Sequence, residues 1–262
     1  MAKRQDPAAD NRRRQARAAQ QAALASAKRR RALTQLAIVG GVALVVIAII
    51  ATAVVLGTRG KNTAAAAGGP VATATTTVDG ASVPFAIGGA NAANGVRVGA
   101  DDAKVTMDLW VDYSCPHCQE FEATNDAALS SLVAAGKLAV TYHNIQIVTD
   151  YGTEAGSAAA CMAVNDPNAW PAFNAALYAN HSADTDSWTS SDLARFATAN
   201  GGGDATQKCI EAATYRSWIT ANTEASAEAG VTGTPTMFIN GEKTDTLSGQ
   251  ELTDRISSLA GA

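Results

Sequence analysis

Apolar and polar residues alternate along the segment KVTMDLWVDY. Val105, Met107, Leu109 and Val111 recur at every second position, which predicts a β-strand with one face in a core. Apolar residues then recur at helical spacing, and Gly136 is typical of a helix end. The sequence therefore predicts a strand followed directly by a helix.

Shorter patterns predict the remaining elements. Strands are expected at VPFAIG, VRVG and KLAVTYHNIQIV, and TPTMFINGEKTDTL is typical of a hairpin with Asn240-Gly241 at its tip. Alanine-rich residues 151–200 predict short helices, a further helix is expected from Asp204 to Gly230, and SGQELTDRISSLA predicts a last one. Without the helical block at about 150–205, the order is βαβ followed by ββα. This order predicts an α/β fold whose central mixed sheet is flanked by helices, with an inserted helical domain.

A different pattern precedes these elements. Leu36–Leu56 holds 21 uncharged, mostly aliphatic residues. About 20 apolar residues cross a bilayer as a helix, so one N-terminal transmembrane helix is expected at 36–56. A cleaved signal peptide is the main alternative, although its apolar core is expected at roughly 7–15 residues. Residues 57–81 are rich in Ala, Gly and Thr and are expected to form a flexible linker before a folded domain at 82–262.

The charges are unevenly distributed around a net charge of −4. Residues 1–33 carry ten of the 20 Lys and Arg against two acids, whereas the rest of the chain has 22 acids and ten bases. An acidic bulk argues against nucleic acid as the main partner. The positive-inside rule predicts a single-pass membrane protein with a cytoplasmic basic tail at 1–35 and an extracytoplasmic folded domain. Anionic lipid headgroups are a second candidate contact of the arginine clusters.

The candidate chemistry lies in DYSCPHCQEF, where Pro116 and His117 separate Cys115 from Cys118. Proline favours the first position of a helix, so Cys115 is expected to cap that helix. Free N–H groups, the helix dipole and a protonated His117 would then stabilise the Cys115 thiolate. Such surroundings lower a cysteine pKa from ~8.5 to roughly 3.5–7.5. Cys115 is the predicted attacking and leaving sulfur, and Cys118 the buried thiol that resolves the mixed disulfide. A stable thiolate in the reduced form makes the disulfide form a strong oxidant.

Three other uses of the pair fit less well. A zinc site needs about four ligands, and the pair is accompanied by no second CxxC and no His at ligand spacing, so no metal is expected. A structural disulfide within CxxC would be strained and easily reduced. A c-type haem needs His directly after the second cysteine, where Gln119 stands. The prediction is a redox-active pair that works without a cofactor.

Two motifs together resemble the DsbA-like branch of the thioredoxin superfamily. One is the CPHC motif of Cys115 and Cys118 at a helix start, and the other is GVTGTPTMFING, whose Thr234-Pro235 precedes a strand. The resemblance covers roughly 82–262 and implies a thioredoxin fold. It also implies a cis Pro235 that packs against Cys115, and a Thr234 whose backbone groups pair with an extended substrate.

One position departs from the family pattern. Many thioredoxin-like enzymes bury an acid six residues before the first cysteine, where this chain has Leu109. Strand alternation is expected to turn the neighbouring Asp108 to the other face, and Glu120 is expected on the surface. Another group, or water, must then move the proton of Cys118.

Cys161 and Cys209 remain once Cys115 pairs with Cys118. In an oxidising compartment they are predicted to form a structural disulfide, which should stabilise the fold by about 4 kcal/mol on the chain-entropy model. Two separate buried thiols are the alternative. The resemblance supports the pairing, because similar membrane-anchored proteins of Gram-positive bacteria with GC-rich genomes carry a second, structural disulfide.

The predicted function is an extracytoplasmic thiol-disulfide oxidoreductase. It is expected to donate the Cys115–Cys118 disulfide to exported proteins with cysteine thiols through a mixed disulfide on Cys115. The resemblance implies a quinone-linked membrane partner that reoxidises it. An anchored reductase or isomerase is the alternative, and a non-catalytic holdase-like binding module is a further one. A monomer is expected, since no dedicated dimerisation segment is evident.

Overall fold

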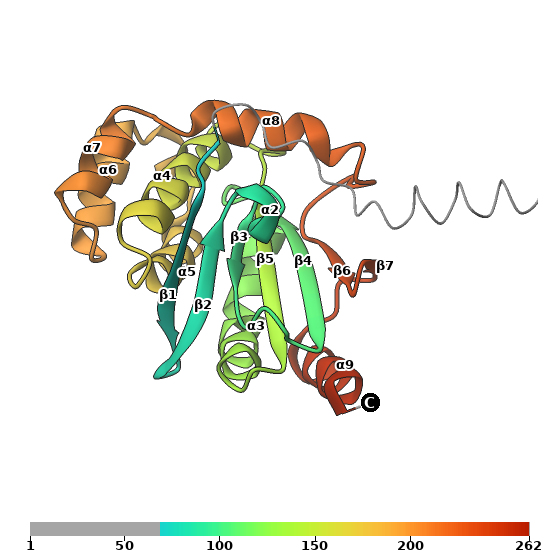
Figure 1. Ribbon diagram of the computed structural model, residues 1–262. Coiled ribbons are helices and arrows are strands. Elements are labelled where there is room, and N and C mark those ends of the chain that lie inside the picture. Colours follow the sequence, from blue (N-terminus) through green and yellow to red (C-terminus); the bar gives the residue numbers. More distant parts are fainter. Residues whose placement is uncertain (1–68, 262) are drawn as a thin grey trace, which may run out of the picture. The chain divides into compact units, whose positions relative to one another are not determined.

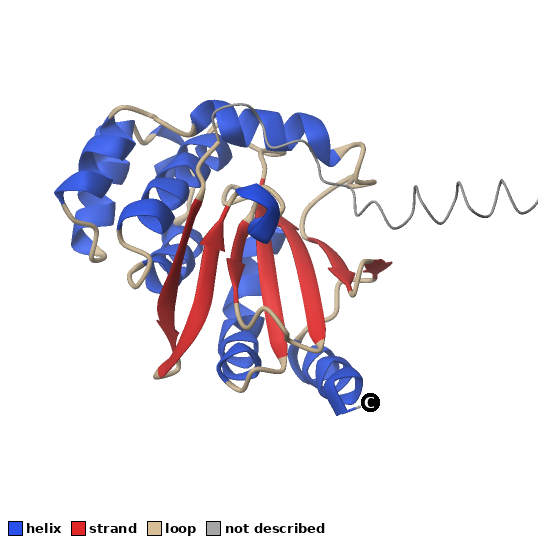
Figure 2. Cartoon of the chain, in the orientation of Figure 1, coloured by secondary structure: helices blue, strands red, loops and turns tan. Residues whose placement is uncertain are grey.

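The computed structural model describes residues 69–261. Its centre is one seven-stranded sheet in the order β1-β2-β3-β5-β4-β6-β7 (Figure 2). The strands are β1 Ala72–Val78, β2 Ala81–Ile87, β3 Val96–Val98, β4 Val105–Val111, β5 Leu138–Asn144, β6 Thr236–Ile239 and β7 Glu242–Thr244. The predicted basic tail and the predicted 36–56 helix lie outside the described residues. Within 69–261, no helix is long and apolar enough to cross a membrane.

The sheet is mixed, because one central pair of strands is parallel. β4 and β5 run parallel, and every other neighbouring pair is antiparallel. All seven residues of β5 are buried, as expected for a strand covered on both faces. β4 carries the predicted alternation, with Val105, Met107 and Leu109 fully buried. The architecture is a thioredoxin-like α/β fold.

Helices surround this sheet (Figure 1). They are α2 Gly89–Ala92, α3 Pro116–Ala134, α4 Tyr151–Asn165, α5 Trp170–Asn180, the 3₁₀ helix η1 Thr185–Ser187, α6 Ser190–Ala199, α7 Asp204–Glu211, α8 Arg216–Ser226 and α9 Gly249–Gly261. α3 and α9 pack on each other and against β5 and β4, so they share one face of the sheet. α4 packs against α5, α6, α7 and α8, and forms the centre of the helical part.

One large hydrophobic core joins the sheet to the helical part. It runs from Leu109 and Leu138 in the central strands to Phe173 and Leu193 in the helices. A smaller cluster of Trp110, Ile145 and Val231 is separate from it. Trp110 follows Leu109 in the strand, so the two clusters lie on opposite faces of the sheet.

The linker predicted over 57–81 is wrong from Ala72 onward, because Ala72–Val78 forms the edge strand β1. The threonines of ATATTTV suit an extended, half-buried strand, and Thr76 and Val78 turn into the protein. The turn to β2 is Asp79-Gly80, and both residues have positive φ, as a tight hairpin requires. The Thr76 hydroxyl donates to the carbonyl of Pro167 at 2.8 Å, which ties the edge strand to the helical part.

Two further boundaries differ from the expected ones. The helix predicted from Asp204 to Gly230 is two helices, α7 and α8. The chain turns between them at Ala213, whose φ is 50°, and the Thr214 hydroxyl donates to the last turn of α7 at the Cys209 carbonyl. The helical part therefore extends past residue 205. The strand predicted over 137–148 ends at Asn144, and the residues after it form a loop beside the CPHC motif.

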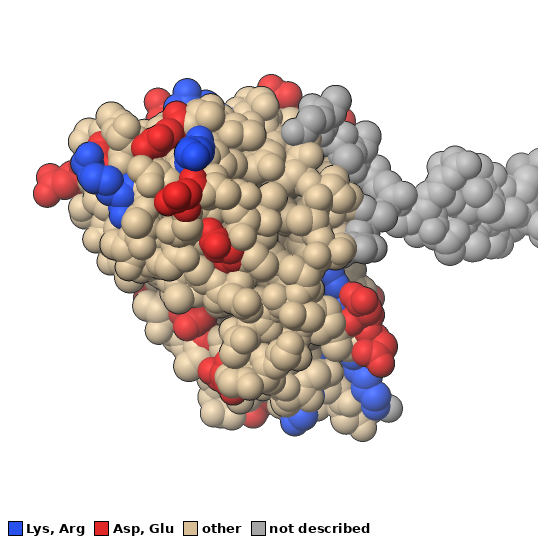
Figure 3. Space-filling view, turned by 60° about the vertical axis from the view of Figure 1, so that its left-hand side comes forward, with Lys and Arg blue, Asp and Glu red and all other residues tan. Residues whose placement is uncertain are grey.

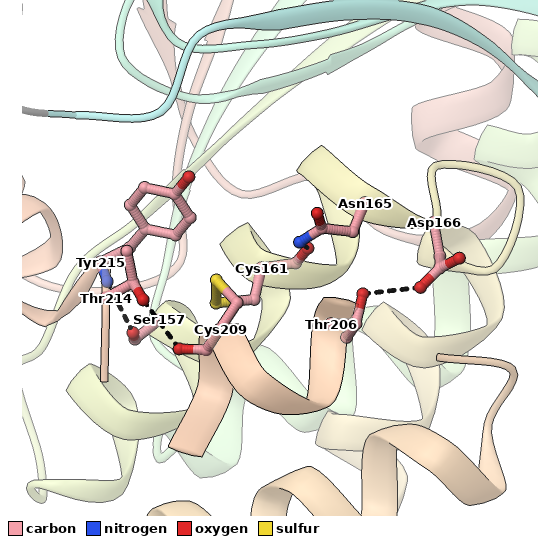
Figure 4. The surroundings of a disulfide bond; sticks show 8 residues. All are labelled: Ser157, Cys161, Asn165, Asp166, Thr206, Cys209, Thr214 and Tyr215. Atoms are coloured by element: carbon pink, nitrogen blue, oxygen red, sulfur yellow. Dashed lines mark hydrogen bonds between the residues drawn. A yellow bond between two sulfur atoms is a disulfide. The ribbon is translucent and has the colours of Figure 1, made fainter. Parts of the chain in front are cut away.

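A disulfide joins α4 to α7 (Figure 4). Cys161 and Cys209 have an S–S distance of 2.00 Å and a Cα–Cα distance of 5.7 Å. Nearby, the Asp166 carboxylate accepts hydrogen bonds from the Thr206 hydroxyl at 2.6 Å and the Gly203 N–H at 2.8 Å. The start of α7 is thus attached to the end of α4 by polar contacts as well. On the face in Figure 3, Lys and Arg are interspersed with Asp and Glu among many uncharged residues.

Candidate active site

The CPHC motif lies where β4 ends and α3 begins. Cys115 has extended backbone angles (φ −87°, ψ 120°) and caps α3, and Pro116 occupies the first helical position. Proline suits this position because its missing N–H would have no partner there. Cys118 then falls in the first turn, on the inner side of the helix. Both cysteines are free thiols, with 5% of Cys115 and 1% of Cys118 exposed.

The fold brings Thr234-Pro235 against Cys115, although 119 residues separate Thr234 from Cys115. The Thr234–Pro235 peptide bond is cis. Cys115 Sγ lies 3.3 Å from the carbonyl oxygen of Thr234. The loop before β6 therefore forms one wall of the site.

The two cysteines have strongly different acidity. A hydrogen bond from the Cys118 thiol is the largest cause that lowers the pKa of Cys115, to about 5, and it outweighs the opposing effect of burial. The Thr234 side chain and the backbone N–H groups of Cys118 and His117 lower it further. The same hydrogen bond and burial raise the pKa of Cys118 well above its usual range. The reduced site is therefore a Cys115 thiolate next to a Cys118 thiol.

The His117 imidazole points to solvent. Its side chain is 81% exposed, and its Nδ1 lies 4.0 Å from the equally exposed Glu120 carboxylate. His117 acts on Cys115 through its backbone N–H. The imidazole is thus available to a bound substrate, and the Cys118 thiol and the backbone N–H groups of the helix start stabilise the thiolate instead.

Asp112 holds the active-site turn to the loop after β5. One carboxylate oxygen accepts from the Ser114 N–H at 2.8 Å and its hydroxyl at 2.6 Å. The other accepts from the backbone N–H groups of Ile147 at 2.7 Å and Val148 at 2.9 Å. A Cβ on Gly152 would lie 2.2 Å from this carboxylate, so glycine is required there. Sequence reasoning missed this clamp, because its partners are about 35 residues apart.

The position six residues before Cys115 carries no acid. Leu109 is fully buried in the main core. Asp108 Oδ1 lies within hydrogen-bond distance of His143 Nε2, at 3.0 Å. The His143 ring stacks on Trp110, with ring centroids 4.4 Å apart. Trp110 belongs to the smaller cluster, so Asp108 lies away from the two cysteines, as strand alternation predicts.

A buried carboxyl lies on the active-site helix instead. Glu122 is only 5% exposed, and its Oε1 accepts from Asn174 Nδ2 at 2.7 Å. Asn174 in turn accepts from the Tyr113 hydroxyl at 2.7 Å. Burial is the main cause that raises the pKa of Glu122 to about 8, and the charge of Asp126 adds to it. The sequence did carry one signal for a role of Glu122 at the site. Glu122 is four residues after Cys118, and this helical spacing puts both on the same inner face.

Two clefts flank the start of α3. One, of about 350 Å³, adjoins the cis-proline loop. Its walls are His117, Glu120, Phe121, Thr124, Thr234, Pro235, Thr246 and Ser248. The other, of about 570 Å³, lies between α3 and α5. Its walls are Pro116, Gln119, Glu120, Glu122, Ala123, Asp126, Ala127, Ala175, Tyr178 and Ala179.

Comparison with known proteins agrees with this geometry. The family model described as Thioredoxin matches residues 91–257. The chain is 30% identical over 158 residues to the serine/threonine-protein kinase PknE of Mycobacterium tuberculosis, a match that covers 54% of this chain. That match spans 28% of the kinase, so the chain corresponds to under a third of the relative's length.

Solved structures give a longer correspondence. DsbA of Mycobacterium tuberculosis in its oxidised form is 25% identical, with a TM-score of 0.56 over 64% of this chain and 93% of that one. The disulfide oxidoreductase DsbG of the same organism, in reduced form, is 26% identical, with a TM-score of 0.54 over 63% of this chain and 82% of that one. The chain belongs to the thioredoxin family and is an enzyme of its DsbA-type branch of thiol-disulfide oxidoreductases.

Proposed function

We propose that the enzyme donates the Cys115–Cys118 disulfide to dithiols of exported proteins. The observation that carries this proposal is the low pKa of Cys115, at about 5, beside a Cys118 whose pKa is raised. A thiolate that is stable at neutral pH favours the reduced enzyme. The disulfide form is then a strong oxidant.

The reaction follows from this asymmetry. A substrate thiolate attacks Cys115 Sγ, the Cys115–Cys118 bond breaks, and the Cys118 sulfur leaves and takes up a proton to become the buried thiol. A second substrate thiolate attacks the substrate sulfur of the mixed disulfide, and Cys115 leaves as a stable thiolate. Low pKa in the leaving thiol speeds this second step. The substrate becomes a disulfide, and the enzyme gains the two electrons.

The cleft beside Pro235 is the proposed substrate groove. It is lined by Thr234, which contacts Cys115, and its walls mix the apolar Phe121 and Pro235 with the hydroxyl-bearing Thr124, Thr246 and Ser248. On the neighbouring loop, Ile147 is 48% and Val148 51% exposed, and the Asp112 clamp holds both backbone N–H groups. These features suit an extended, unfolded segment more than a small ligand. We propose that the backbone of Thr234 pairs with that segment.

The proposed setting is the outer side of the cell membrane. The Cys161–Cys209 disulfide supports an oxidising compartment. Leu36–Leu56 is the proposed anchor, on its length and its basic flank. A quinone-linked membrane partner is the proposed reoxidant. Protease accessibility in intact cells tests the topology, and loss of the folded domain to added protease is the expected result.

The reduction potential of the Cys115–Cys118 couple tests the direction of the reaction. Equilibration of residues 69–262 with glutathione is expected to give a value near about −120 mV, at the oxidising end of the superfamily range. A value near about −270 mV, at the thioredoxin end, would make the enzyme an anchored reductase. A Cys115→Ser variant separates catalysis from holdase-like binding, because protein binding that survives it does not need the thiols.

A further inference from the structure

The proton of Cys118 needs a carrier. Cys118 is 1% exposed and its thiol is the stable form, so its sulfur must gain a proton whenever substrate opens the disulfide. The family's acid position is occupied by the apolar, fully buried Leu109. The carrier must therefore come from another element of the fold.

We propose that Glu122 donates this proton to the Cys118 sulfur and takes it back when the disulfide re-forms. Glu122 and Cys118 lie four residues apart in α3, and side chains at this spacing meet on one face, with Cβ atoms about 5–6 Å apart. Both are buried residues of that helix. The inference deepens the proposed function, on which it rests.

Tyr178 of α5 shares the wall of the cleft between α3 and α5 with Glu122. Its hydroxyl is buried without a hydrogen-bond partner, so it is free to bridge a carboxyl and a sulfur. Burial is the largest cause that raises the pKa of Tyr178, and the charges of Tyr113, Cys118 and Glu122 add to it. The Tyr178 hydroxyl is thus within electrostatic reach of both ends of the proposed transfer.

Water reaches the carboxyl through the cleft of about 570 Å³ between α3 and α5. Glu122 and Tyr178 form buried parts of its wall, and Glu120, Ala123 and Asp126 form its exposed parts. A cleft of this size holds several water molecules. After each transfer, Glu122 can therefore exchange its proton with solvent.

Burial, together with the charge of Asp126, keeps the Glu122 carboxyl protonated at neutral pH. Asp126 is the acidic neighbour on α3, and Asn174 and Tyr178 face it from α5. Tyr113 and the β5 residue Tyr142 complete the titratable surroundings, and the charge of Glu122 raises the pKa of both. None of these groups is a cation. A pKa of about 8 is close to the operating pH, which suits a group that must both give and take a proton.

The step balances in both directions. Substrate thiolate, enzyme disulfide and the Glu122 carboxylic acid give the mixed disulfide on Cys115, the Cys118 thiol and the Glu122 carboxylate. In reverse, the carboxylate removes the Cys118 proton, and the new thiolate expels the partner from Cys115 as a thiolate. No electron acceptor beyond the disulfide is needed.

Glu122→Gln tests the proposal, because glutamine keeps the acceptor for Asn174 and cannot titrate. The rates of thiol-disulfide exchange with reduced and oxidised glutathione are measured in both directions between pH 6 and 9.5, and corrected for the glutathione thiolate fraction. In the native enzyme the opening rate should fall above pH about 8. In Glu122→Gln this inflection should vanish, and the rate at pH 7 should drop at least about tenfold. That is less than the 10²–10⁴ typical of general acids, because water also reaches the site.

Glu251→Gln is the matched control, since its carboxylate is exposed on α9 and is not part of the wall of either cleft. It should keep both the rate and the inflection. The Cys115 thiolate titration must stay near pH 5 in Glu122→Gln, which shows an intact site. Native rates with a retained inflection near pH 8 in Glu122→Gln would overturn the proposal.

A second variant tests the same proposal if Glu122→Gln does not fold. Asp126→Asn removes a charge that raises the pKa of Glu122, so the inflection should move to lower pH. An unmoved inflection would refute the assignment. Glutathione exchange can be measured in both directions whatever the physiological role of the enzyme. A low reduction potential would therefore overturn the oxidase proposal, and the test of Glu122 would still give a clear result.

Discussion

The acidity of Cys115 depends most on the side chain of one neighbour. The Cys118 thiol is the largest cause that lowers the pKa of Cys115, ahead of the Thr234 side chain and the backbone N–H groups at the helix start. The CPHC motif is therefore more than a helix cap with a reactive sulfur. Its second cysteine also lowers the pKa of the first.

Cys118→Ala should raise the pKa of Cys115, because alanine removes the strongest hydrogen-bond donor to the thiolate. Cys118→Ser is the matched control, since its hydroxyl can still donate. Thiolate absorbance near 240 nm across pH gives the midpoint of each variant. We expect about 5 for the native reduced protein, a shift of at least about one unit upward for Cys118→Ala, and a smaller shift for Cys118→Ser. Equal midpoints in the two variants would contradict this account.

Glu122→Gln should change the pH dependence of stability. Folding raises the pKa of Glu122 from 4.5 to about 8, so the unfolded chain releases a proton in this window that the folded protein retains. The native free energy of unfolding therefore falls as pH rises from about 4.5 to about 8. Glutamine does not titrate, so the free energy of unfolding of the variant does not fall over this pH range. The variant should be more stable than the native protein by on the order of 3 kcal/mol at pH 8, with little difference at pH 4. Urea unfolding at both pH values checks it, and a gap that does not vary with pH would contradict it.

Single residues differ in how far the sequence predicts them. The roles of Cys115 and Cys118 follow from local spacing, because Pro116 fixes where the helix starts. Glu122 and Asp112 could not be assigned in the same way. A carboxylate in a helix resembles any surface acid until the Asn174 contact and the surrounding burial are known, and the Asp112 contacts to Ile147 and Val148 arise only in the fold.

At the scale of elements, the sequence predicts regular segments better than short ones. The β4–α3 unit and the β6–β7 hairpin follow from clear periodicity and from Asn240-Gly241. β1 was missed because small residues mask its alternation, although the Asp79-Gly80 turn is a recognisable hairpin signal. The break between α7 and α8 lies at Ala213, where neither Gly nor Pro marks a turn.

Loss of the disulfide should loosen α7 from α4. The sequence separation of 48 between Cys161 and Cys209 gives a stabilisation of about 4 kcal/mol on the chain-entropy model. A Cys161→Ala, Cys209→Ala double variant should lose roughly that free energy of unfolding, measured by denaturant titration. The Cys115 titration should stay unchanged, because α7 is not among the groups that act on this residue. A loss under about 1 kcal/mol would mean that the Asp166 contacts and the apolar packing suffice.

For the whole molecule, β1 belongs to the folded unit. It pairs with β2 along all seven residues, and its Thr76 reaches the helical part at Pro167. The edge strand β1 is therefore held both by β2 and by the helical part. The folded region begins before the predicted residue 82.

Removal of residues 1–81 should destabilise the protein relative to removal of residues 1–68. The longer deletion unpairs β2 and uncovers Val83, Phe85 and Ile87, which are buried in the intact sheet. We expect a loss of a few kcal/mol, as for other large losses of buried apolar contact, and a lower melting temperature. Calorimetry of the two truncated proteins checks it, and equal melting temperatures would show that β1 is dispensable.

The unequal acidity of the two cysteines also fixes how many protons each turnover exchanges with the surroundings. Between pH about 5 and 8, the reduced enzyme holds one thiolate and one thiol, whereas an ordinary protein dithiol holds two protons. Each disulfide donated therefore releases one net proton. The equilibrium for oxidising a substrate should shift about tenfold for every pH unit, equivalent to about 30 mV or 1.4 kcal/mol. An enzyme working outside the cytoplasm would thus oxidise its substrates less completely as its surroundings become acidic.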